Sequence, residues 1–101
     1  MSAIHVNEEN FETEVLHSDK PVLLDFFATW CGPCRMLGPV LEEIAKERTD
    51  IKVCKVDIDQ APDLANEFKV MSVPTVFAIK HGKITGKTMG VQPKRSLLAM
   101  V

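Results

Sequence analysis

The chain has 101 residues, of which 46% are hydrophobic and 26% charged, and its net charge is only -2. This length and balance suit one folded domain that buries its own core without disulfide or metal support, and they exclude a disordered chain. Lysine and arginine are scattered rather than clustered, which argues against a nucleic acid or an acidic membrane surface as partner.

The first part of the chain predicts a short strand, a helix and a second strand. Residues 4–6 predict the first strand, and Asn7 is a suitable N-cap for a helix over residues 8–17 with an acidic first turn. Residues 21–27 form a nearly continuous apolar run, which is typical of a strand covered on both faces. A single carboxylate, Asp25, interrupts that run.

A pair of cysteines, Cys31 and Cys34, follows this second strand. Beyond the pair, apolar residues recur at helical spacing and predict a helix that continues to about Arg48 and bends at Pro39. Residues 51–57 are again rich in apolar side chains, and they predict another buried strand.

The remainder of the chain predicts a helix, a hairpin and a last helix. Pro62 suits the first turn of the helix, because its missing N–H is not needed there. Residues 75–79 are β-branched and aromatic, which favours a strand, and residues 81–82 resemble the tight turn of a hairpin that leads into residues 83–85. Pro93 could open the last helix.

The predicted order of elements is therefore βαβαβαββα, which is typical of the α/β class. Strands separated by helices are expected to pair in parallel, and the last two strands, joined by the hairpin, are expected to be antiparallel. This gives a central mixed sheet of five strands with helices on both faces. Because the sequence contains no repeat, low-complexity tract or linker, residues 1–101 are expected to form a single domain.

The motif Cys31-Gly32-Pro33-Cys34 carries the chemistry. Two cysteines at this spacing can close a small disulfide ring, and at the start of a helix the first sulfur meets unpaired N–H groups and the positive end of the helix dipole. A thiolate is stabilised there, and thiolate is the nucleophile of disulfide exchange. We therefore assign Cys31 as the nucleophile that forms a mixed disulfide and Cys34, expected to be the more enclosed of the two, as the residue that resolves it.

Two other interpretations of these cysteines are less consistent with the sequence. A zinc site needs four ligands, and the sequence offers no second Cys-x-x-Cys motif and only scattered histidines at His5, His17 and His81. An inert buried pair is disfavoured because a strand-to-helix turn is hard to bury. The third cysteine, Cys54, lies in an apolar strand and is interpreted as a small core residue, with a regulatory role left open.

The segment FFATWCGPCRM, residues 26–36, resembles the active-site stretch of the thioredoxin family. The family's oxidases and isomerases usually carry a histidine in place of Pro33, and Phe27 stands where a tryptophan is common. The resemblance covers almost the whole chain, since it continues through Pro39, Lys55, Asp59, residues 73–75, residues 80–82 and Gly90.

This resemblance implies a thioredoxin fold and a protein-disulfide reductase that cycles between a dithiol and a disulfide. It further implies that Asp25 accepts and donates the proton of Cys34, with Lys55 modulating the carboxyl group. A buried carboxylate without a partner has a raised pKa, because burial disfavours its charged form. The alternative interpretation is that Asp25 belongs to a structural ion pair.

The resemblance also implies a docking surface for the substrate. In the family, the peptide bond that matches Val73-Pro74 is cis and faces the dithiol, and the backbone at the position of Val73 pairs with an extended substrate. Asp59 is a candidate hydrogen-bond acceptor for the indole of the neighbouring tryptophan. The full set of implied docking residues is Trp30, Gly32, Pro33, Val73, Pro74, Gly90 and Val91.

The sequence contains no glycine-rich nucleotide-binding motif, so the electrons are expected to come from a partner. By resemblance this partner is a thioredoxin reductase, usually NADPH-dependent. The clients would be enzymes with catalytic disulfides, such as ribonucleotide reductase, peroxiredoxins or methionine sulfoxide reductases. The only redox group implied is the Cys31–Cys34 disulfide itself.

The N-terminal residues do not resemble a secretory signal, and no segment approaches the roughly 18 apolar residues of a membrane span. A cytoplasmic monomer is therefore expected. Two rival functions remain: an oxidase or isomerase, which the Gly-Pro dipeptide between the cysteines disfavours, and a binding module that uses the same face without redox turnover.

Overall fold

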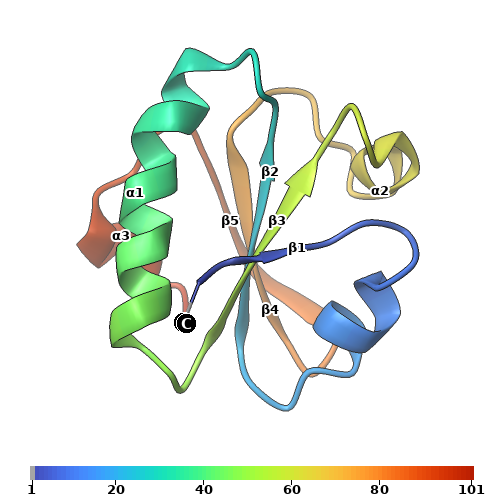
Figure 1. Cartoon of the computed structure of the whole chain (residues 1–101). Coiled ribbons are helices and arrows are strands. Elements are labelled where there is room, and N and C mark those ends of the chain that lie inside the picture. Colours follow the sequence, from blue (N-terminus) through green and yellow to red (C-terminus); the bar gives the residue numbers. More distant parts are fainter. Residues whose placement is uncertain (1) are drawn as a thin grey trace.

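In the computed structural model, which describes residues 2–101, one mixed sheet has the strand order β1-β3-β2-β4-β5 (Figure 1). The predicted order of elements and the five-stranded α/β fold are confirmed. In chain order the elements are β1 (Ile4–His5), η1 (Glu12–Leu16), β2 (Val22–Phe27), α1 (Gly32–Glu47), β3 (Lys52–Asp57), α2 (Pro62–Glu67), β4 (Thr75–Lys80), β5 (Lys83–Met89) and α3 (Lys94–Leu98).

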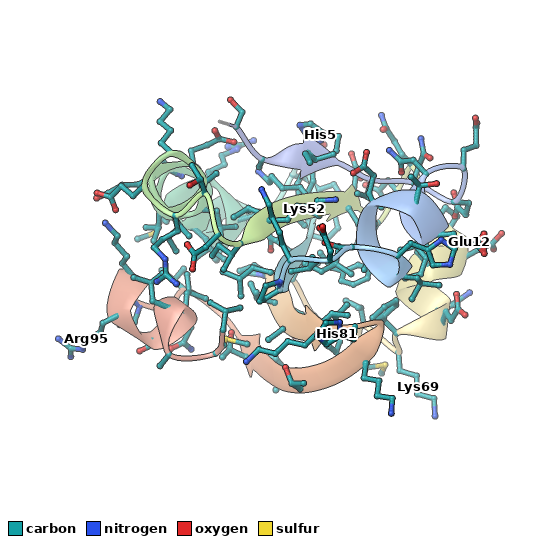
Figure 2. The ribbon with its side chains drawn as sticks, turned by 90° about the horizontal axis from the view of Figure 1, so that it is seen from below. His5, Glu12, Lys52, Lys69, His81 and Arg95 are labelled. Carbon is teal, nitrogen blue, oxygen red and sulfur yellow. A yellow bond between two sulfur atoms is a disulfide. The ribbon has the colours of Figure 1, made fainter. Side chains whose placement is uncertain are left out.

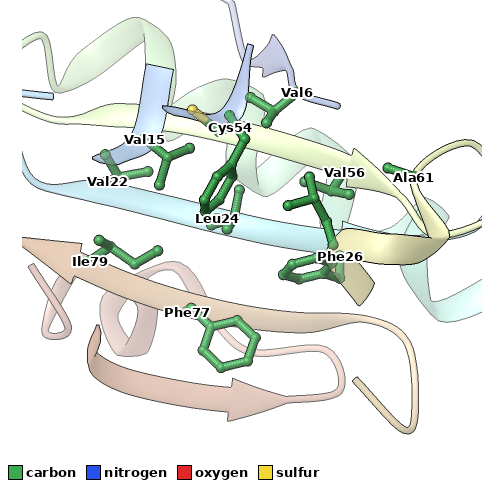
Figure 3. Packing of buried hydrophobic residues seen from close by; sticks show 12 residues of the cluster. Val6, Val15, Val22, Leu24, Phe26, Cys54, Val56, Ala61, Phe77 and Ile79 are labelled. Carbon is green, nitrogen blue, oxygen red and sulfur yellow. The ribbon is translucent and has the colours of Figure 1, made fainter. Parts of the chain in front are cut away.

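The central strand β2 sends its side chains alternately to the two faces of the sheet, as a pleated strand must. Leu24 and Phe26 join a buried cluster with η1 and α2, which Figure 3 shows, whereas Leu23 packs with α1 and α3 on the other face. Figure 1 shows the same division, with α1 and α3 on one side of the sheet and η1 and α2 on the other. Asp25 shares the parity of Leu23, so it lies on the α1 face.

One expected pairing is wrong. β1 and β2 both pair in parallel with β3, as predicted, but β4 is antiparallel to β2 although a helix precedes it. A parallel crossover must return along the full length of the sheet, about 20 Å for a six-residue strand. The six-residue helix α2 spans only about 9 Å. The chain therefore re-enters the sheet beside Phe26, at the end where β3 left it.

The first helix is shorter than predicted. Instead of residues 8–17, a single π-helical segment covers Glu12–Leu16, and the preceding residues form a turn. Asn7 does cap backbone N–H groups, because its side-chain oxygen accepts from the N–H of Glu9 and of Asn10. The two bonds are those of an N-cap, and the N–H of Phe11 donates to the carbonyl of Asn7, so a helical turn does begin at this point. From Glu12 onward the hydrogen bonds widen to the π pattern, as in the bond from the N–H of His17 to the carbonyl of Glu12.

The hairpin between β4 and β5 is confirmed. His81 and Gly82 both have positive φ angles, 50° and 76°, as a two-residue turn between twisted strands requires. The turn lies at the end of the sheet opposite to the start of α1 (Figure 1). Within residues 2–101, no helix is long and apolar enough to cross a membrane.

Candidate redox site

Cys31 occupies the N-cap position of α1, directly after the loop that leaves β2. Its sulfur accepts a hydrogen bond from the backbone N–H of Cys34 at 3.2 Å, and the two cysteines form a disulfide with their Cα atoms 5.3 Å apart. Pro33 lies in the first turn, where its missing N–H leaves no unsatisfied donor. The first sulfur of the motif thus lies at the positive end of a sixteen-residue helix, where negative charge is stabilised.

The two cysteines are equally enclosed, which corrects the expectation that Cys34 is the more buried. Their exposed fractions are 5% for Cys31 and 6% for Cys34. The reason is long-range: the carbonyl oxygen of Val73 lies 3.6 Å from the Cys31 sulfur, so a distant segment covers the helix start. The asymmetry between the sulfurs therefore comes from the N–H group and dipole at Cys31, not from burial.

Asp25 is buried beneath this helix start, with an exposed fraction of 1%. Within the described residues, neither of its carboxyl oxygens has a hydrogen-bond partner. Burial raises the pKa of Asp25 to about 7, and the positive charge of Lys55 opposes that shift only in part. The group can therefore take up or release a proton near neutral pH, as general acid–base chemistry requires.

Lys55 lies on the α1 face, in register with Asp25 on the neighbouring strand. Its ammonium group lies 4.6 Å from the centre of the Phe27 ring, a cation–π contact that holds a charge on a largely apolar wall. A hollow of about 250 Å³ is lined by Phe27, Cys34, Gly38 and Lys55 among others, so it connects the lysine with the second cysteine. The fold therefore brings Asp25, Lys55 and Cys34 to the same region.

The predicted docking residues lie at the rim of the site. Pro74 is buried, and the others are half-buried or exposed. Trp30 is 65% exposed, and its indole N–H donates to the carboxylate of Asp59 at 2.8 Å, as expected from the sequence. The Val73-Pro74 peptide bond is cis. Gly90 donates its N–H to the carbonyl of Pro74 at 2.9 Å and has a φ of +82°, a backbone conformation that favours glycine.

The remaining predicted rim residues are solvent-accessible. Gly32 and Pro33 are exposed at the start of α1, and Val91, which follows Gly90, is 42% exposed. The docking residues thus lie near the start of α1, whereas Asp25 and Lys55 lie within β2 and β3 on the face of the sheet that α1 covers.

Sequence reasoning missed two residues that pack against the disulfide, Ala28 and Ile58. Ala28 also accepts the backbone N–H of Cys31 at 3.2 Å. Ile58 could have been assigned to the site from the sequence. It directly follows β3, and the carboxyl ends of neighbouring parallel strands lie at the same edge of a sheet. Because β2 and β3 were both predicted, residues just after each could have been assigned to one site.

Cys54 lies apart from this site, in the buried cluster under η1 and α2 (Figure 3). Its exposed fraction is 0%, and burial raises the pKa of its thiol to about 12. We expect iodoacetamide at pH 8 to alkylate the reduced protein at Cys31 and to leave Cys54 unmodified until the protein is unfolded. Peptide mass mapping measures this, and alkylation of native Cys54 at a rate near that of Cys31 would contradict it.

Within residues 2–101, the structure holds no group of three or more His, Cys, Asp or Glu side chains placed to bind a metal ion.

Comparison with known proteins adds to this geometry. The family model described as Thioredoxin matches residues 2–101. A thioredoxin of Mycobacterium tuberculosis is 50% identical over 98 residues, which cover 96% of this chain and 84% of that protein. A thioredoxin of Rickettsia felis is 45% identical over 97 residues, which cover 95% of this chain and 92% of that protein. A bifunctional thioredoxin reductase/thioredoxin of Mycobacterium leprae is 48% identical over 96 residues, which cover 94% of this chain and 21% of that protein.

Proposed function

The chain belongs to the thioredoxin family, and from that membership we propose the roles of its individual residues in disulfide exchange. The function itself follows from the family and from the Cys31–Cys34 disulfide: the protein is a dithiol–disulfide oxidoreductase that acts on protein disulfides. Its redox group is that disulfide, and it needs no further cofactor. The observation that carries the role assignment is the position of Cys31 at the N-cap of α1.

In the proposed reaction, the thiolate of Cys31 attacks one sulfur of a client disulfide. A mixed disulfide forms and the other client sulfur leaves as a thiolate, which takes a proton from solvent. The thiolate of Cys34 then attacks the Cys31 sulfur, closes the ring and releases the second client sulfur. Two electrons pass from the dithiol to the client, so the client disulfide is reduced as the protein becomes oxidised.

Asp25 is proposed to take the Cys34 proton in the second step and to return it when the protein is reduced. A carboxyl group with a pKa of about 7 is suited to both directions at neutral pH. Lys55 is proposed to limit the rise of that pKa, since its charge stabilises the carboxylate.

The rim of the redox site is proposed as the client-docking surface. It comprises Trp30, Gly32, Pro33, Val73, Pro74, Gly90 and Val91. The carbonyl of Val73, close to the Cys31 sulfur, offers an acceptor to the backbone of an extended client segment.

The electron donor is proposed to be a separate thioredoxin reductase that uses NADPH. The Mycobacterium leprae relative, named as both a thioredoxin reductase and a thioredoxin, supports the pairing of these two activities. We further propose that the clients carry catalytic disulfides. The protein is proposed to be a monomer with a single domain over residues 1–101 and to be located in the cytoplasm.

A coupled assay tests the proposed roles. Purified protein, a thioredoxin reductase, NADPH and insulin as the disulfide client are mixed, and the consumption of NADPH is followed. We expect steady turnover that Cys31→Ser abolishes, whereas Cys54→Ser turns over at the parent rate. Full turnover by Cys31→Ser would refute the role of Cys31, and failure with NADPH but success with dithiothreitol would refute only the proposed donor.

A further inference from the structure

The acidic residues of this protein are confined to one part of the chain, although the net charge is only -2. All fourteen aspartate and glutamate residues lie within residues 1–67, whereas residues 68–101 contain six of the twelve lysines and arginines and no acid. The even spacing of the basic residues along the sequence hides this division, because it is the acids that are unevenly placed. The acid-free part forms β4, β5 and α3, one edge of the sheet.

This basic edge is largely free to interact. Among the described residues, Lys94 is the only one of its six cations in an ion pair, with Glu43 and Glu47 of α1. Figure 2 shows Lys69 and Arg95 with His81 along the side that carries β5 and α3, while Glu12 lies on the η1 side. Lys69 and Lys87 are both exposed.

A row of exposed side chains runs along β5 from the redox site towards the hairpin. We call Ile84, Lys87 and Met89 the β5 stripe, because all three lie beside residues of β4 that face η1 and α2. Ile84 is 56% exposed and Met89 is 59% exposed. The Lys87 ammonium lies 5.6 Å from the centre of the Phe77 ring, so the cation is held over the same face.

The Met89 end of the β5 stripe lies next to the redox site. The hydroxyl of Ser72 lies 3.9 Å from the sulfur of Met89, and Ser72 precedes Val73, whose carbonyl touches the Cys31 sulfur. Met71, 94% exposed, extends the apolar surface at this junction. A chain bound at the Val73 carbonyl therefore has an apolar path onto β5.

The Ile84 end of the β5 stripe lies at a groove of about 240 Å³ between the hairpin, η1 and α2. Phe68 and Ile84 are among the apolar residues that line it, Glu67 is its one acidic lining residue, and the exposed Lys69 follows Phe68 in the chain. From Met89 to Ile84 the stripe spans about 17 Å. The surface thus combines apolar contacts with exposed cations over a length that an extended peptide of several residues would cover.

The opposite flank of the redox site has the reverse charge. Residues 57–63 contain three acids and no base, and Asp59 is bonded to Trp30 there. A client segment with negative charge would be repelled from this flank and attracted to β5, because like charges repel and opposite charges attract at close range.

We propose that the β5 stripe and Lys69 form an extended docking surface for a segment of the client protein that carries aspartate or glutamate among apolar residues. This inference rests on the proposed function and adds a substrate class to it. The apolar residues of the segment contact Met89 and Ile84, and its carboxylates pair with Lys87 and Lys69. Attraction of this kind raises the rate of encounter and selects among clients, and it weakens as salt is added.

Chromogenic peptides test the proposal. Each ten-residue peptide carries one cysteine in a mixed disulfide with a coloured thiol, and pairs of Glu, Gln or Lys residues are placed at positions two to eight residues from the cysteine. Reduced protein is mixed with each peptide in a stopped-flow instrument, at low and at high salt. We expect the Glu peptide to react roughly threefold faster than the Gln peptide at low salt, with the Lys peptide slowest.

Two variants locate the effect. Lys87→Glu, alone and with Lys69→Glu, is expected to abolish or reverse the preference for the Glu peptide and to leave the rate with the free coloured disulfide unchanged. Lys46→Glu, the same charge change on exposed α1, is the matched control and is expected to keep the preference.

Three results would overturn the inference: equal rates for the Glu and Gln peptides with the parent protein, an equal effect of Lys46→Glu, or concentration-dependent self-association that Lys87→Glu alone removes. The last result would make a second copy of this chain the occupant. Loss of reaction with the free coloured disulfide in the parent protein would instead count against the proposed function.

Discussion

Replacing Asp25 by alanine is expected to stabilise the oxidised protein above neutral pH. The folded-state pKa of about 7 exceeds the ordinary aspartate value of 3.8, so between these two pH values the carboxyl group stays protonated in the folded state while it ionises in the unfolded state. Its contribution to the free energy of unfolding is therefore present at pH below about 4 and is lost as the pH rises towards 7. The difference of roughly three pH units corresponds to about 4 kcal/mol at most, from which the small cavity left by alanine subtracts about 1 kcal/mol.

Urea unfolding of the parent and of Asp25→Ala between pH 3 and pH 8 measures this effect. The two stabilities are expected to be similar near pH 3 and to separate as the pH rises, with the variant ahead by about 2–4 kcal/mol at pH 8. Asp25→Asn is the control of similar volume, because it removes the charge but retains a buried polar group. A variant that is less stable at pH 8 would mean that an unseen partner compensates the carboxylate in the folded state.

The same substitution is expected to slow the second step of exchange, because it removes the buried carboxyl group whose pKa of about 7 suits it to take the Cys34 proton. Stability and rate should therefore move in opposite directions in Asp25→Ala. This opposition distinguishes a proton carrier from a purely structural carboxylate, whose removal would lower stability and leave the rate unchanged.

Replacing Cys34 by serine is expected to convert the protein from a turnover catalyst into a trap. Cys31 retains its place at the N-cap of α1, so it still attacks a client disulfide, but no thiolate is left to resolve the product. Release of the reduced client is expected to fall by a factor of roughly 10³ or more, as when one member of a catalytic group is removed. Mixed disulfides between Cys31 and its clients, which a reductant cleaves, should therefore accumulate.

Affinity capture of tagged Cys34→Ser from a lysate, followed by non-reducing electrophoresis, measures this accumulation. Cys31→Ser is expected to yield no adducts, and Cys34→Ser combined with Cys54→Ser is expected to yield the same adducts as Cys34→Ser alone. Adducts that disappear only with Cys54→Ser would show that the buried thiol reacts, and adducts with Cys31→Ser would reverse the roles of the two active-site cysteines.

Local patterns in the sequence predicted most of the fold. The apolar run of β2, the helical spacing of α1 and the turn residues His81 and Gly82 each specify their element through contacts between near neighbours. The antiparallel pairing of β4 was not predicted, since it depends on how far α2 can carry the chain across the sheet. The π-helical form of η1 was not predicted, because Asn7 caps an ordinary helical turn and the sequence pattern contains no signal for the wider hydrogen bonds that begin at Glu12.

The redox site divides in a similar way. The chemistry of Cys31 could be argued from the spacing of the motif and a helix start, both local features. The equal burial of the two cysteines could not, because Val73 covers Cys31 from 42 residues away. Likewise Asp25 stood out in its apolar strand, but its unpaired state depends on everything packed around it.

The exposed Trp30 has one further consequence. It is the single tryptophan of a chain that contains no tyrosine, and it neighbours the disulfide while its indole is fixed by Asp59. All tryptophan fluorescence of the protein therefore originates at the rim of the redox site, with no background from the core. The molecule carries an intrinsic optical probe at the place where clients dock, so binding and oxidation can both be followed without a label.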